Sequence, residues 1–482
     1  MADNVREQQF LQAEHLVELQ SGALKKELRL GDLILSQVLY IVGIQWLGTA
    51  GKLGSAHLMY WIPAVLLFYI PSGIVVTHLA AEMPLEGGLY QWAKLRFGEL
   101  IGFLVALNLW ATVVLLVAST MSVLTDNVAY AAGPSGAWIV ESKLITATLS
   151  ALVIGGLALV SIRGMSIAKW LHNVGGFVLV LVLSAMLFFA LPRWIHGTFA
   201  TAPVSLALPA VTLLNLNIAA KMGFGAFCGF DGCCIFSGEI RNRSIARTIR
   251  RSIFLSGPLI ALIYIAGTAC SLAFTQPADL DLISTPTQAL TRGAQGTSLA
   301  FIVGPVAAAL LIVSTLGAAS IYFNAVNRLP MVAGWDHLLP AWLSRLHPRF
   351  KTPMGSIVCV AIATFVLTLF GNFGVGAQEA FQFLNNTGII CWALTYLVMF
   401  SIPLIARGEK PPVGVRIAAF AGLAMTALYV VLSVLPIVDV RNSAFFTTKV
   451  ILVILGINGA GAWYFNRATR MRKSLVAVEF AE

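Results

Sequence analysis

Long apolar runs, separated by short polar links, are the dominant pattern along the chain. A helix needs about 20 predominantly apolar residues to cross a hydrocarbon core of about 30 Å, and the sequence supplies about twelve such runs. They cover residues 30–50, 58–81, 97–125, 144–162, 167–191, 216–238, 253–274, 299–326, 356–370, 381–405, 417–435 and 445–465. Because these runs are apolar on all sides, they predict membrane-spanning helices rather than strands that alternate apolar and polar residues.

Composition agrees with this pattern. The chain of 482 residues is 58% hydrophobic and 11% charged, whereas a soluble domain contains about 25% charged residues. We therefore predict an all-α integral membrane protein with about twelve transmembrane helices in a lipid bilayer.

Basic residues collect on alternate links between the runs. This distribution places 24 of the 31 Lys and Arg residues on one side of the membrane, and the positive-inside rule identifies that side as the cytoplasm. We expect a cell membrane protein with both termini cytoplasmic, beginning with a tail over residues 1–29. The net charge of +10 then reflects the orientation of the chain in the membrane. No basic run is interleaved with aromatic residues, so we expect no nucleic-acid partner.

Motifs for enzymatic chemistry are missing from the predicted spans. The six cysteines lie inside these spans without metal-ligand spacing, so we predict buried thiols and no metal site. The sequence contains no P-loop, no HExxH motif and no paired carboxylates or Ser/His constellation within the spans. We expect no cofactor, no catalytic residue and no enzymatic activity.

The sixth run has an unusual composition. It continues as "GFGAFCGFDGCCIFSGEIRN", residues 223–242, with five glycines and two carboxylates. Each glycine costs a helix interior about 1 kcal/mol relative to alanine, so either close helix packing or an intended helix break must explain them. Asp231 lies in mid-span and should be buried, whereas Glu239 is within reach of water near the end. Lys221, close to the other face, can extend its stem to water.

A second glycine-rich interruption occurs five spans earlier. The first run reads "LYIVGIQWLGTAGKLG", residues 39–54. Paired interrupted helices at corresponding positions are typical of transporters built from inverted repeats, with the binding site between the two interruptions. Spans one to five and six to ten would form the two repeats.

Four segments together identify a family resemblance. They are "GIQWLGTAG" in the first span, "EMPLEGGLYQWAKLRFGELIGF" after the second, "GFD" followed by "GEIRN" in the sixth, and "NRLPMVAGWDHLLPAWLSRLHPRFKTP" after the eighth. In this order they resemble the amino acid/polyamine/organocation (APC) transporter superfamily from about residue 28 to about residue 411. The resemblance implies a 5+5 inverted-repeat core of the leucine-transporter type over residues 30–405, with discontinuous helices 1 and 6. Residues 406–482 would add two spans, which support packing or a homodimer, and a cytoplasmic tail.

The resemblance also implies where a small-molecule substrate binds. Members of the family hold the substrate's carboxylate and amino groups at the two interruptions. Carried over to this sequence, the substrate-binding residues are Gly43, Ile44, Gln45, Trp46, Thr112, Val113, Phe224, Phe227, Cys228, Gly229 and Tyr322.

The first interruption departs from the family pattern. This chain has Ile44 and Gln45 where the family usually has a small residue and a glycine. The Gln45 amide carries both donors and an acceptor. Two interpretations remain open: Gln45 contacts the substrate, or it hydrogen-bonds a neighbouring helix.

Two kinds of coupling ion are considered. Asp231 matches an acidic position that the resemblance links to proton coupling, and burial favours the protonated form of a carboxyl group; the alternative is an aspartate that fixes helix packing. Ser314, Thr315 and Ser320 in the eighth span are weaker candidates for sodium binding.

The sequence therefore predicts a secondary transporter, a symporter or exchanger, that moves an amino acid by alternating access and is a candidate for proton coupling. The apolar residues Ile44 and Trp46, without a dense acidic pocket, favour a zwitterionic amino acid over a polyamine. A polyamine or other amine transporter of the same fold, and an amino acid receptor that has lost transport, are the alternatives.

Overall fold

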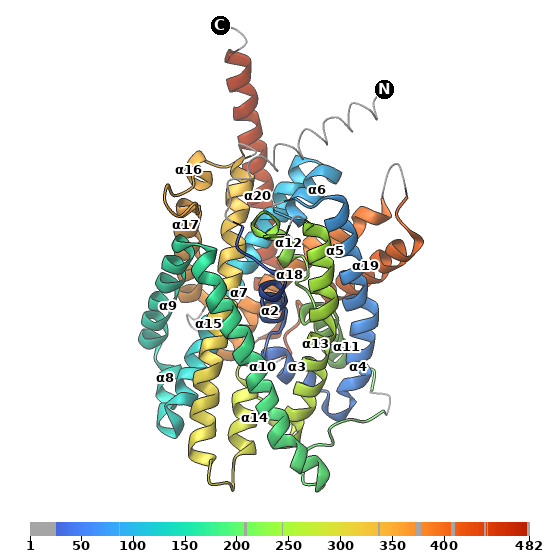
Figure 1. The fold of residues 1–482 in the computed structure, drawn as a ribbon, viewed down its shortest axis with the longest axis vertical. Helices are drawn as coiled ribbons and strands as arrows, with labels where there is room; N and C mark the ends of the chain where they lie inside the picture. Colours follow the sequence, from blue (N-terminus) through green and yellow to red (C-terminus); the bar gives the residue numbers. More distant parts are fainter. Residues whose placement is uncertain are drawn as a thin grey trace.

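Long helices run between the upper and lower ends of the molecule as drawn in Figure 1. The computed structural model describes residues 26–85, 87–206, 210–242, 244–335, 338–371, 377–405, 410–437, 440 and 442–479. Residues 1–25 of the predicted N-terminal tail lie outside this part. Within the described residues there is no β-sheet, and an isolated parallel bridge joins Leu28 to Ile240. The predicted all-helical, multi-span fold is confirmed.

Most of the predicted runs form continuous apolar helices long enough to cross a bilayer. In the described part of the chain these are Gly54–Glu82, Glu99–Ala131, Lys143–Arg163, Met165–Ile195, Ile245–Phe274, Ala300–Met331, Glu379–Leu404, Val413–Leu432 and Ser443–Arg470. The first of them contains α4 (Leu58–Ala64), the π-helical turn η2 (Val65–Tyr69) and α5 (Ile70–Glu82). The others belong to α7 (Glu99–Ala131), α9 (Lys143–Arg163), α10 (Met165–Ile195), α13 (Ile245–Phe274), α15 (Ala300–Trp335), α18 (Ala377–Leu404), α19 (Val413–Leu432) and α20 (Ser443–Glu479).

The remaining three runs form shorter or interrupted helices. The first run consists of α2 (Leu30–Ile41) and α3 (Gln45–Gly51), which are bent by 49° relative to each other. The sixth consists of α11 (Leu213–Ala220), the π-helical turn η4 (Lys221–Gly225) and α12 (Gly232–Ile235). The ninth forms α17 (Met354–Gly371). The predicted discontinuities of the first and sixth spans are thus present.

Short helices lie at the two ends of the bundle. At the upper end in Figure 1 are α6 (Leu89–Phe97) and α16 (Ala341–Ser344), and at the lower end are α8 (Ala137–Glu141) and α14 (Thr285–Gly293). Single helical turns complete the set: η1 (Gly54–His57), η3 (Gly133–Gly136), η5 (Ser237–Glu239) and η6 (Pro277–Asp279).

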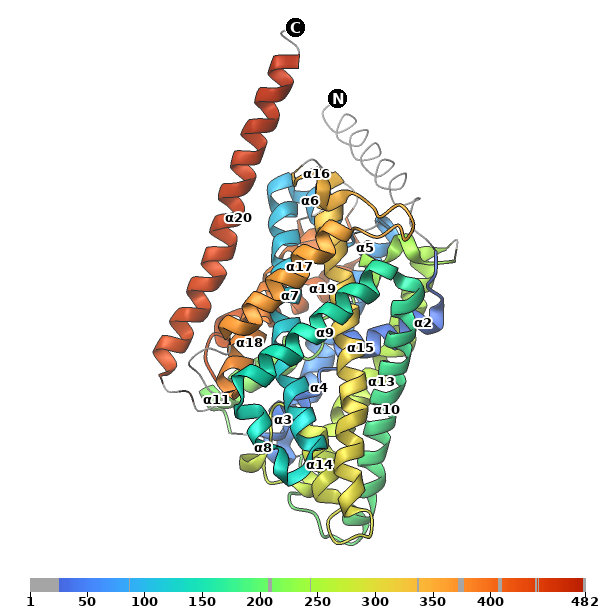
Figure 2. The same ribbon diagram turned by 90° about the vertical axis from the view of Figure 1, so that its left-hand side faces the viewer.

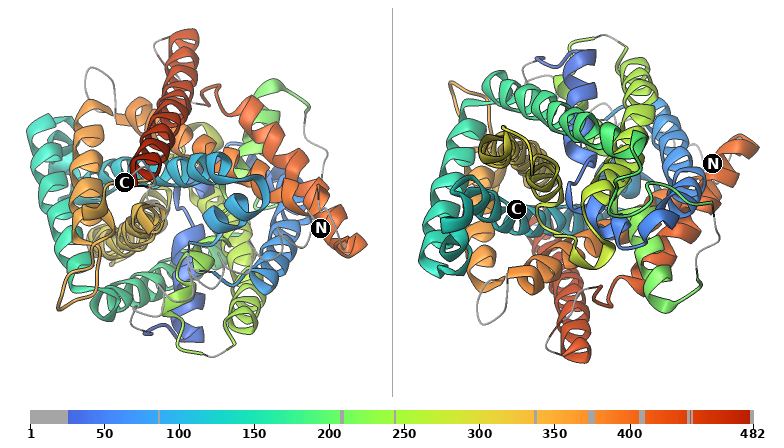
Figure 3. Two further views of the ribbon diagram at one scale, coloured as in Figure 1. Left: turned by 90° about the horizontal axis from the view of Figure 1, so that it is seen from above. Right: turned by 90° about the horizontal axis from the view of Figure 1, so that it is seen from below.

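The interrupted first span lies inside the bundle, and the last helix lies at its edge. Figure 3 shows α2 between α10 and α13, both of which it contacts. Figure 2 shows α20 along one side, inclined away from the other helices. It contacts α7 and α18, and the Asn108 amide on α7 donates a hydrogen bond of 2.7 Å to Asn458. The bundle therefore surrounds the predicted site, while α20 is peripheral.

Two glycines allow α10 and α15 to approach closely. A Cβ atom on Gly317 would lie 3.1 Å from the Cα atom of Gly175 and 3.0 Å from the carbonyl oxygen of Leu171. Because both atoms belong to the backbone, they cannot move aside as a flexible side chain would. Small residues at such crossings let membrane helices pack through their backbones.

We predict that Gly317→Ala destabilises the protein by about 1–3 kcal/mol, the usual range for overpacking a well-filled interior. The measurement is the apparent melting temperature of the purified protein in detergent. Gly155→Ala on α9 is the matched control, because nothing lies within 4 Å of its Cβ position. Equal melting temperatures for the two variants would contradict the prediction.

Candidate functional site

The first interruption separates α2 from α3 over residues 42–44. Val42 is extended, with φ −75° and ψ 97°, so the helical hydrogen-bond pattern stops at this point. The Gly43 N–H instead donates to the hydroxyl group of Tyr264 on α13, at 3.0 Å. Helical bonding resumes when the Trp46 N–H donates to the Gly43 carbonyl at 3.0 Å.

The second interruption separates η4 from α12 over residues 226–231. The Ala226 N–H donates to the Lys221 carbonyl oxygen at 3.1 Å, and this hydrogen bond completes the π-helical turn. Gly229 has a φ of +135°, a conformation that favours glycine. A Cβ atom on Gly232 would lie 2.5 Å from the Tyr40 ring on α2. The glycines of this run therefore serve both purposes considered from the sequence, since Gly229 permits the break and Gly232 permits close packing.

A single side chain connects the two interruptions. The Tyr264 hydroxyl lies 2.7 Å from the Ile41 carbonyl oxygen in the first span and 2.8 Å from the Ala226 carbonyl oxygen in the sixth. The same oxygen accepts the Gly43 N–H. The ring is fully buried and stacks on Trp61, with the centroids 5.0 Å apart. Three backbone groups that the breaks release from helical bonding thus share one hydroxyl group.

Asp231 lies at the end of the second interruption and contacts α18. Its side chain is fully buried, as predicted. The Tyr396 hydroxyl donates to one carboxylate oxygen at 2.6 Å, and the Trp392 Nε1–H donates to the other at 3.4 Å. The Tyr396 oxygen in turn accepts the Gly229 N–H at 2.9 Å. The carboxylate is therefore joined through Tyr396 to the strained glycine of the break.

A cavity of about 70 Å³ lies beside the first interruption. This volume exceeds the space that one water molecule needs and is smaller than ordinary ligand pockets of about 300–1,000 Å³. The wall comes from the first break and from α2, α7, α10, α15 and α18. Lining residues with side-chain or exposed backbone polar groups are Gly43, Gln45, Ser119, Thr120, Ser314, Thr315, Tyr322 and Asn385. The structure thus holds a small, partly polar space at the break.

The structure brings only some of the predicted site residues to this cavity. Gly43, Ile44, Gln45 and Tyr322 line it, together with two of the sodium candidates, Ser314 and Thr315. The Gln45 side chain is folded toward Gly43, because a Cβ atom on Gly43 would lie 2.6 Å from Gln45 Nε2. The Tyr322 hydroxyl donates to the Tyr40 carbonyl at 2.5 Å.

The predicted residues of the sixth span face an aromatic cluster instead. The Phe227 ring stacks on Tyr69, with centroids 4.3 Å apart, and the Phe224 ring lies 4.9 Å from Tyr429. The Cys228 thiol donates a hydrogen bond of 3.4 Å to the Gly225 carbonyl oxygen. These side chains are fully or almost fully buried, and the Phe227 ring also contacts Tyr264, with the centroids 5.3 Å apart.

The other predicted residues lie in helix contacts. The Thr112 hydroxyl on α7 donates to the Gly388 carbonyl on α18 at 3.0 Å, and Val113 and Trp46 are buried. Trp46 lies over Gly225, since a Cβ atom there would be 2.6 Å from its ring. Ser320, the third sodium candidate, is hydrogen-bonded to His172 at 3.2 Å.

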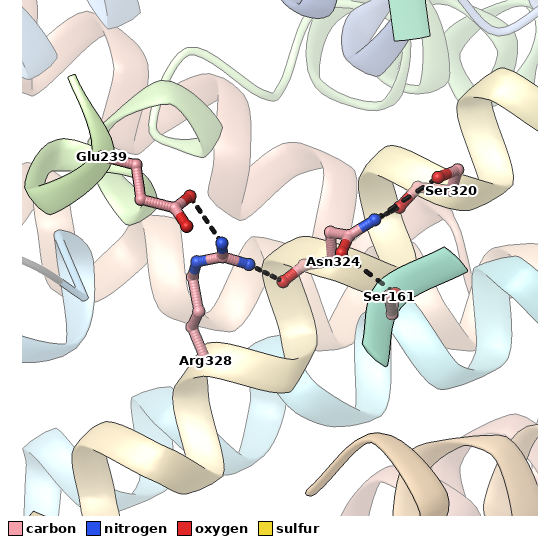
Figure 4. Close-up of polar contacts among 5 residues, drawn as sticks. All are labelled: Ser161, Glu239, Ser320, Asn324 and Arg328. Atoms are coloured by element: carbon pink, nitrogen blue, oxygen red, sulfur yellow. Dashed lines mark hydrogen bonds and ion pairs between the residues drawn. The ribbon is translucent and has the colours of Figure 1, made fainter. Parts of the chain in front are cut away.

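A buried ion pair joins η5 to α15 (Figure 4). Arg328 on α15 lies 2.5 Å from Glu239 of η5, and its second terminal nitrogen donates to the Asn324 carbonyl at 2.6 Å. The Ser161 hydroxyl on α9 donates to the Asn324 side-chain oxygen at 2.9 Å. Glu239 is 6% exposed, so the expectation that water reaches it is wrong, because Arg328 compensates its charge inside the protein.

Further contacts hold the start of α2 at the upper end. The Lys169 ammonium group on α10 lies 3.0 Å from Glu27, and the Asn173 amide on α10 donates to Asp32 at 2.8 Å. The backbone bridge between residues 28 and 240 joins this segment to the chain that follows η5. The first and sixth spans are therefore tied to each other and to α10 and α15 at the upper end.

Sequence reasoning missed the groups that hold the breaks, Tyr264, Trp392 and Tyr396. Their only sequence signal is a polar group on an aromatic ring within an apolar run, since buried Tyr and Trp usually find a hydrogen-bond partner. The prediction for Lys221 is wrong in a different way. Its side chain is 1% exposed and donates to Asn386 on α18 at 3.1 Å, rather than reaching water.

We predict that Tyr264→Phe lowers the apparent melting temperature by several degrees. The variant leaves a buried N–H and two buried carbonyls without their shared partner, and each such group costs about 1–3 kcal/mol. Tyr60→Phe on α4 is the control, because Tyr60 is half-buried and its hydroxyl makes no hydrogen bond to the described residues. An unchanged melting temperature for Tyr264→Phe would show that the breaks do not depend on this hydroxyl.

Comparison with known proteins gives consistent results along most of the chain. A family model described as amino acid permease matches residues 31–458. An uncharacterized transporter of Legionella pneumophila is 24% identical over 404 residues, which are 80% of this chain and 82% of that protein. A probable agmatine/putrescine antiporter of Lactococcus lactis is 21% identical over 381 residues, 78% of each chain. The Asc-type amino acid transporter 1 of Mus musculus is 25% identical over 375 residues, 75% of this chain and 65% of that protein.

Proposed function

This chain belongs to the amino acid permease family of the APC superfamily, and on that premise we propose that it moves an amino acid across a cell membrane by alternating access. We place the transport core in residues 30–405 and both termini in the cytoplasm, with residues 406–482 as accessory spans and a tail. The relatives are named transporters, which supports a transporter rather than an enzyme.

The observation that carries this proposal is the meeting of two interrupted helices at Tyr264, beside the cavity. Interrupted helices in a membrane are tolerated where their free backbone groups line a polar site or bond to protein. The first break does both, because Gly43 bonds to Tyr264 and also lines the cavity. A substrate with hydrogen-bonding ends is therefore a suitable occupant.

The composition of the cavity wall favours a zwitterionic amino acid over a polyamine. Among the described residues that line the cavity there is no carboxylate and no ammonium or guanidinium group. A polyamine carries several positive charges, and buried charges require paired or hydrogen-bonded partners. An α-amino acid carries one charge of each sign. Backbone groups and the amides of Gln45 and Asn385 can hydrogen-bond both charges. We therefore propose that Gln45 contacts the substrate.

The closed upper end is consistent with one state of an alternating-access cycle. Glu239 and Arg328 are paired there, and opening toward the upper end requires their separation. The helix α15 connects the cavity to this ion pair, because it carries both Tyr322, which lines the cavity, and Arg328. We propose that the upper end faces the cytoplasm and that this structure is closed on that side.

The test is counterflow in proteoliposomes. Vesicles that contain the purified protein are loaded with one unlabelled amino acid or polyamine at a time, and uptake of the labelled compound is followed without an ion gradient. We expect transient accumulation with neutral amino acids and none with putrescine or agmatine. Accumulation with polyamines alone would replace the amino acid with an amine. No accumulation, despite thermal stabilisation by an amino acid, would support a receptor instead.

We further propose that Asp231 couples transport to protons. Protonation would remove the charge that holds the Tyr396 hydroxyl, and Tyr396 also accepts the N–H of Gly229. Loading a proton would thus release the second break from α18. The alternative, a purely structural Asp231, predicts no link between its charge and uptake.

We expect Asp231→Asn to weaken the dependence of uptake on pH between about pH 5 and 8, since the amide does not titrate. The measurement is the initial rate of amino acid uptake as a function of external pH. Asp281→Asn serves as a control for a half-buried aspartate outside this site, because Asp281 accepts a hydrogen bond from Tyr130 at 3.0 Å. An unchanged pH profile in Asp231→Asn would assign Asp231 to packing.

A further inference from the structure

Lys221 is a buried lysine without a charged partner among the described residues. Its ammonium nitrogen donates to the side-chain oxygen of Asn386 at 3.1 Å and to the backbone oxygen of Ser433 at 3.5 Å. The Asn386 amide nitrogen also donates to the Ser433 oxygen, at 3.4 Å. Both acceptors are neutral, and the side chain is fully enclosed.

In the part of the chain that the structure describes, the elements around Lys221 supply no carboxylate at ion-pair distance. The turn η4 packs against α3, α4, η2, α11 and α19, and α18 provides Asn386. Titratable or charged side chains on these elements are Tyr60, Tyr69, Glu379, Cys391, Tyr396, Arg416 and Tyr429. Glu379 lies seven residues before Asn386 on α18, which is about 10 Å along the helix axis. Arg416 is about 20 Å along α19 from Tyr429, by the same rise per residue.

An isolated ammonium group in this position lacks the compensation that a buried charge normally has. Removing an unpaired charge from water costs several kcal/mol even after the protein relaxes, and two neutral oxygen acceptors return only part of it. Asp231, ten residues later in the same broken span, differs because two donors already stabilise its charged form. Lys221 has no such charge-stabilising partner among the described residues.

Lys221 is also connected to both parts of the candidate site. Its backbone carbonyl accepts the Ala226 N–H that closes the π-helical turn at the start of the break. Its side-chain partner Asn386 follows Asn385, which lines the cavity. A change at the ammonium nitrogen therefore acts on residues that adjoin the second break and the cavity wall.

We propose that Lys221 is a proton-coupling residue of this transporter. When the bundle opens to the side with more protons, entering water solvates the nitrogen and the amine takes up a proton. When it opens to the side with fewer protons, the ammonium group gives that proton to water and the electron pair stays on the nitrogen. In the neutral form, a rotated Asn386 amide can donate to the nitrogen. This inference rests on the proposed transport function and adds Lys221 to Asp231 as a second residue that carries the coupling proton.

The experiment compares two assays on the same proteoliposomes, with a mixture of radiolabelled standard amino acids as the probe. Counterflow without a gradient measures exchange, and accumulation under a proton gradient directed inward measures coupling. We expect Lys221→Met to exchange at a rate within about twofold of the wild type and to lose the gradient-driven accumulation. Lys449→Met is the matched control, because Lys449 lies half-buried on α20 over Phe445, and it should accumulate the probe like the wild type.

A second variant keeps the lysine and protects the test against misfolding of Lys221→Met. Asn386→Asp places a carboxylate at the ammonium group, which should hold the proton and also abolish accumulation while exchange continues. Accumulation at the wild-type level in either folded variant would overturn the proposal. Exchange by the wild type without any response to the proton gradient would overturn it too. Failure of wild-type exchange would instead remove the proposed function, and this inference with it.

Discussion

One phenolic hydroxyl group holds the arrangement on which the candidate site depends. The Tyr264 oxygen accepts the Gly43 N–H and lies within 2.8 Å of carbonyl oxygens from both interrupted spans. A hydroxyl has a single proton, so it can satisfy only one of the two carbonyls, Ile41 or Ala226, at any moment. The breaks are therefore joined by a hydrogen bond that can be exchanged between two acceptors without separating the helices, and at any moment one of the two carbonyls is without it.

The interruptions could be predicted from the sequence, but their partners could not. Glycine content and the spacing of five spans located the breaks, because glycine weakens a helix wherever it occurs. Tyr264 and Tyr396 bond to residues 221 and 167 positions away along the chain, and no periodic pattern encodes which helix face meets another. The hydropathy pattern also led to the wrong prediction that the Lys221 side chain reaches water, whereas it is buried. Since α11 begins at Leu213, Lys221 lies about 12 Å along the helix axis from that end, beneath α18 and α19.

The resemblance placed both interruptions at one binding site, and their side chains have different surroundings in this structure. Residues of the first break line the cavity, whereas Phe224 and Phe227 of the sixth span belong to an aromatic cluster with Tyr69, Tyr264 and Tyr429. Aromatic side chains bury large areas and pack in defined orientations, so this cluster gives the sixth span a rigid backing. The cavity has a volume of about 70 Å³, so a substrate larger than a few atoms requires it to widen.

The buried pair of Glu239 and Arg328 restricts how this sequence can diverge. Replacing either residue alone leaves its partner charged in a place without water, at a cost of about 3–5 kcal/mol. A typical stability of 5–15 kcal/mol cannot absorb many losses of that size. Substitutions at positions 239 and 328 should therefore be found only as coordinated changes, such as a charge reversal or a joint conversion to apolar residues. The contact between Glu239 and Arg328 thus acts as an evolutionary linkage between the sixth and eighth spans.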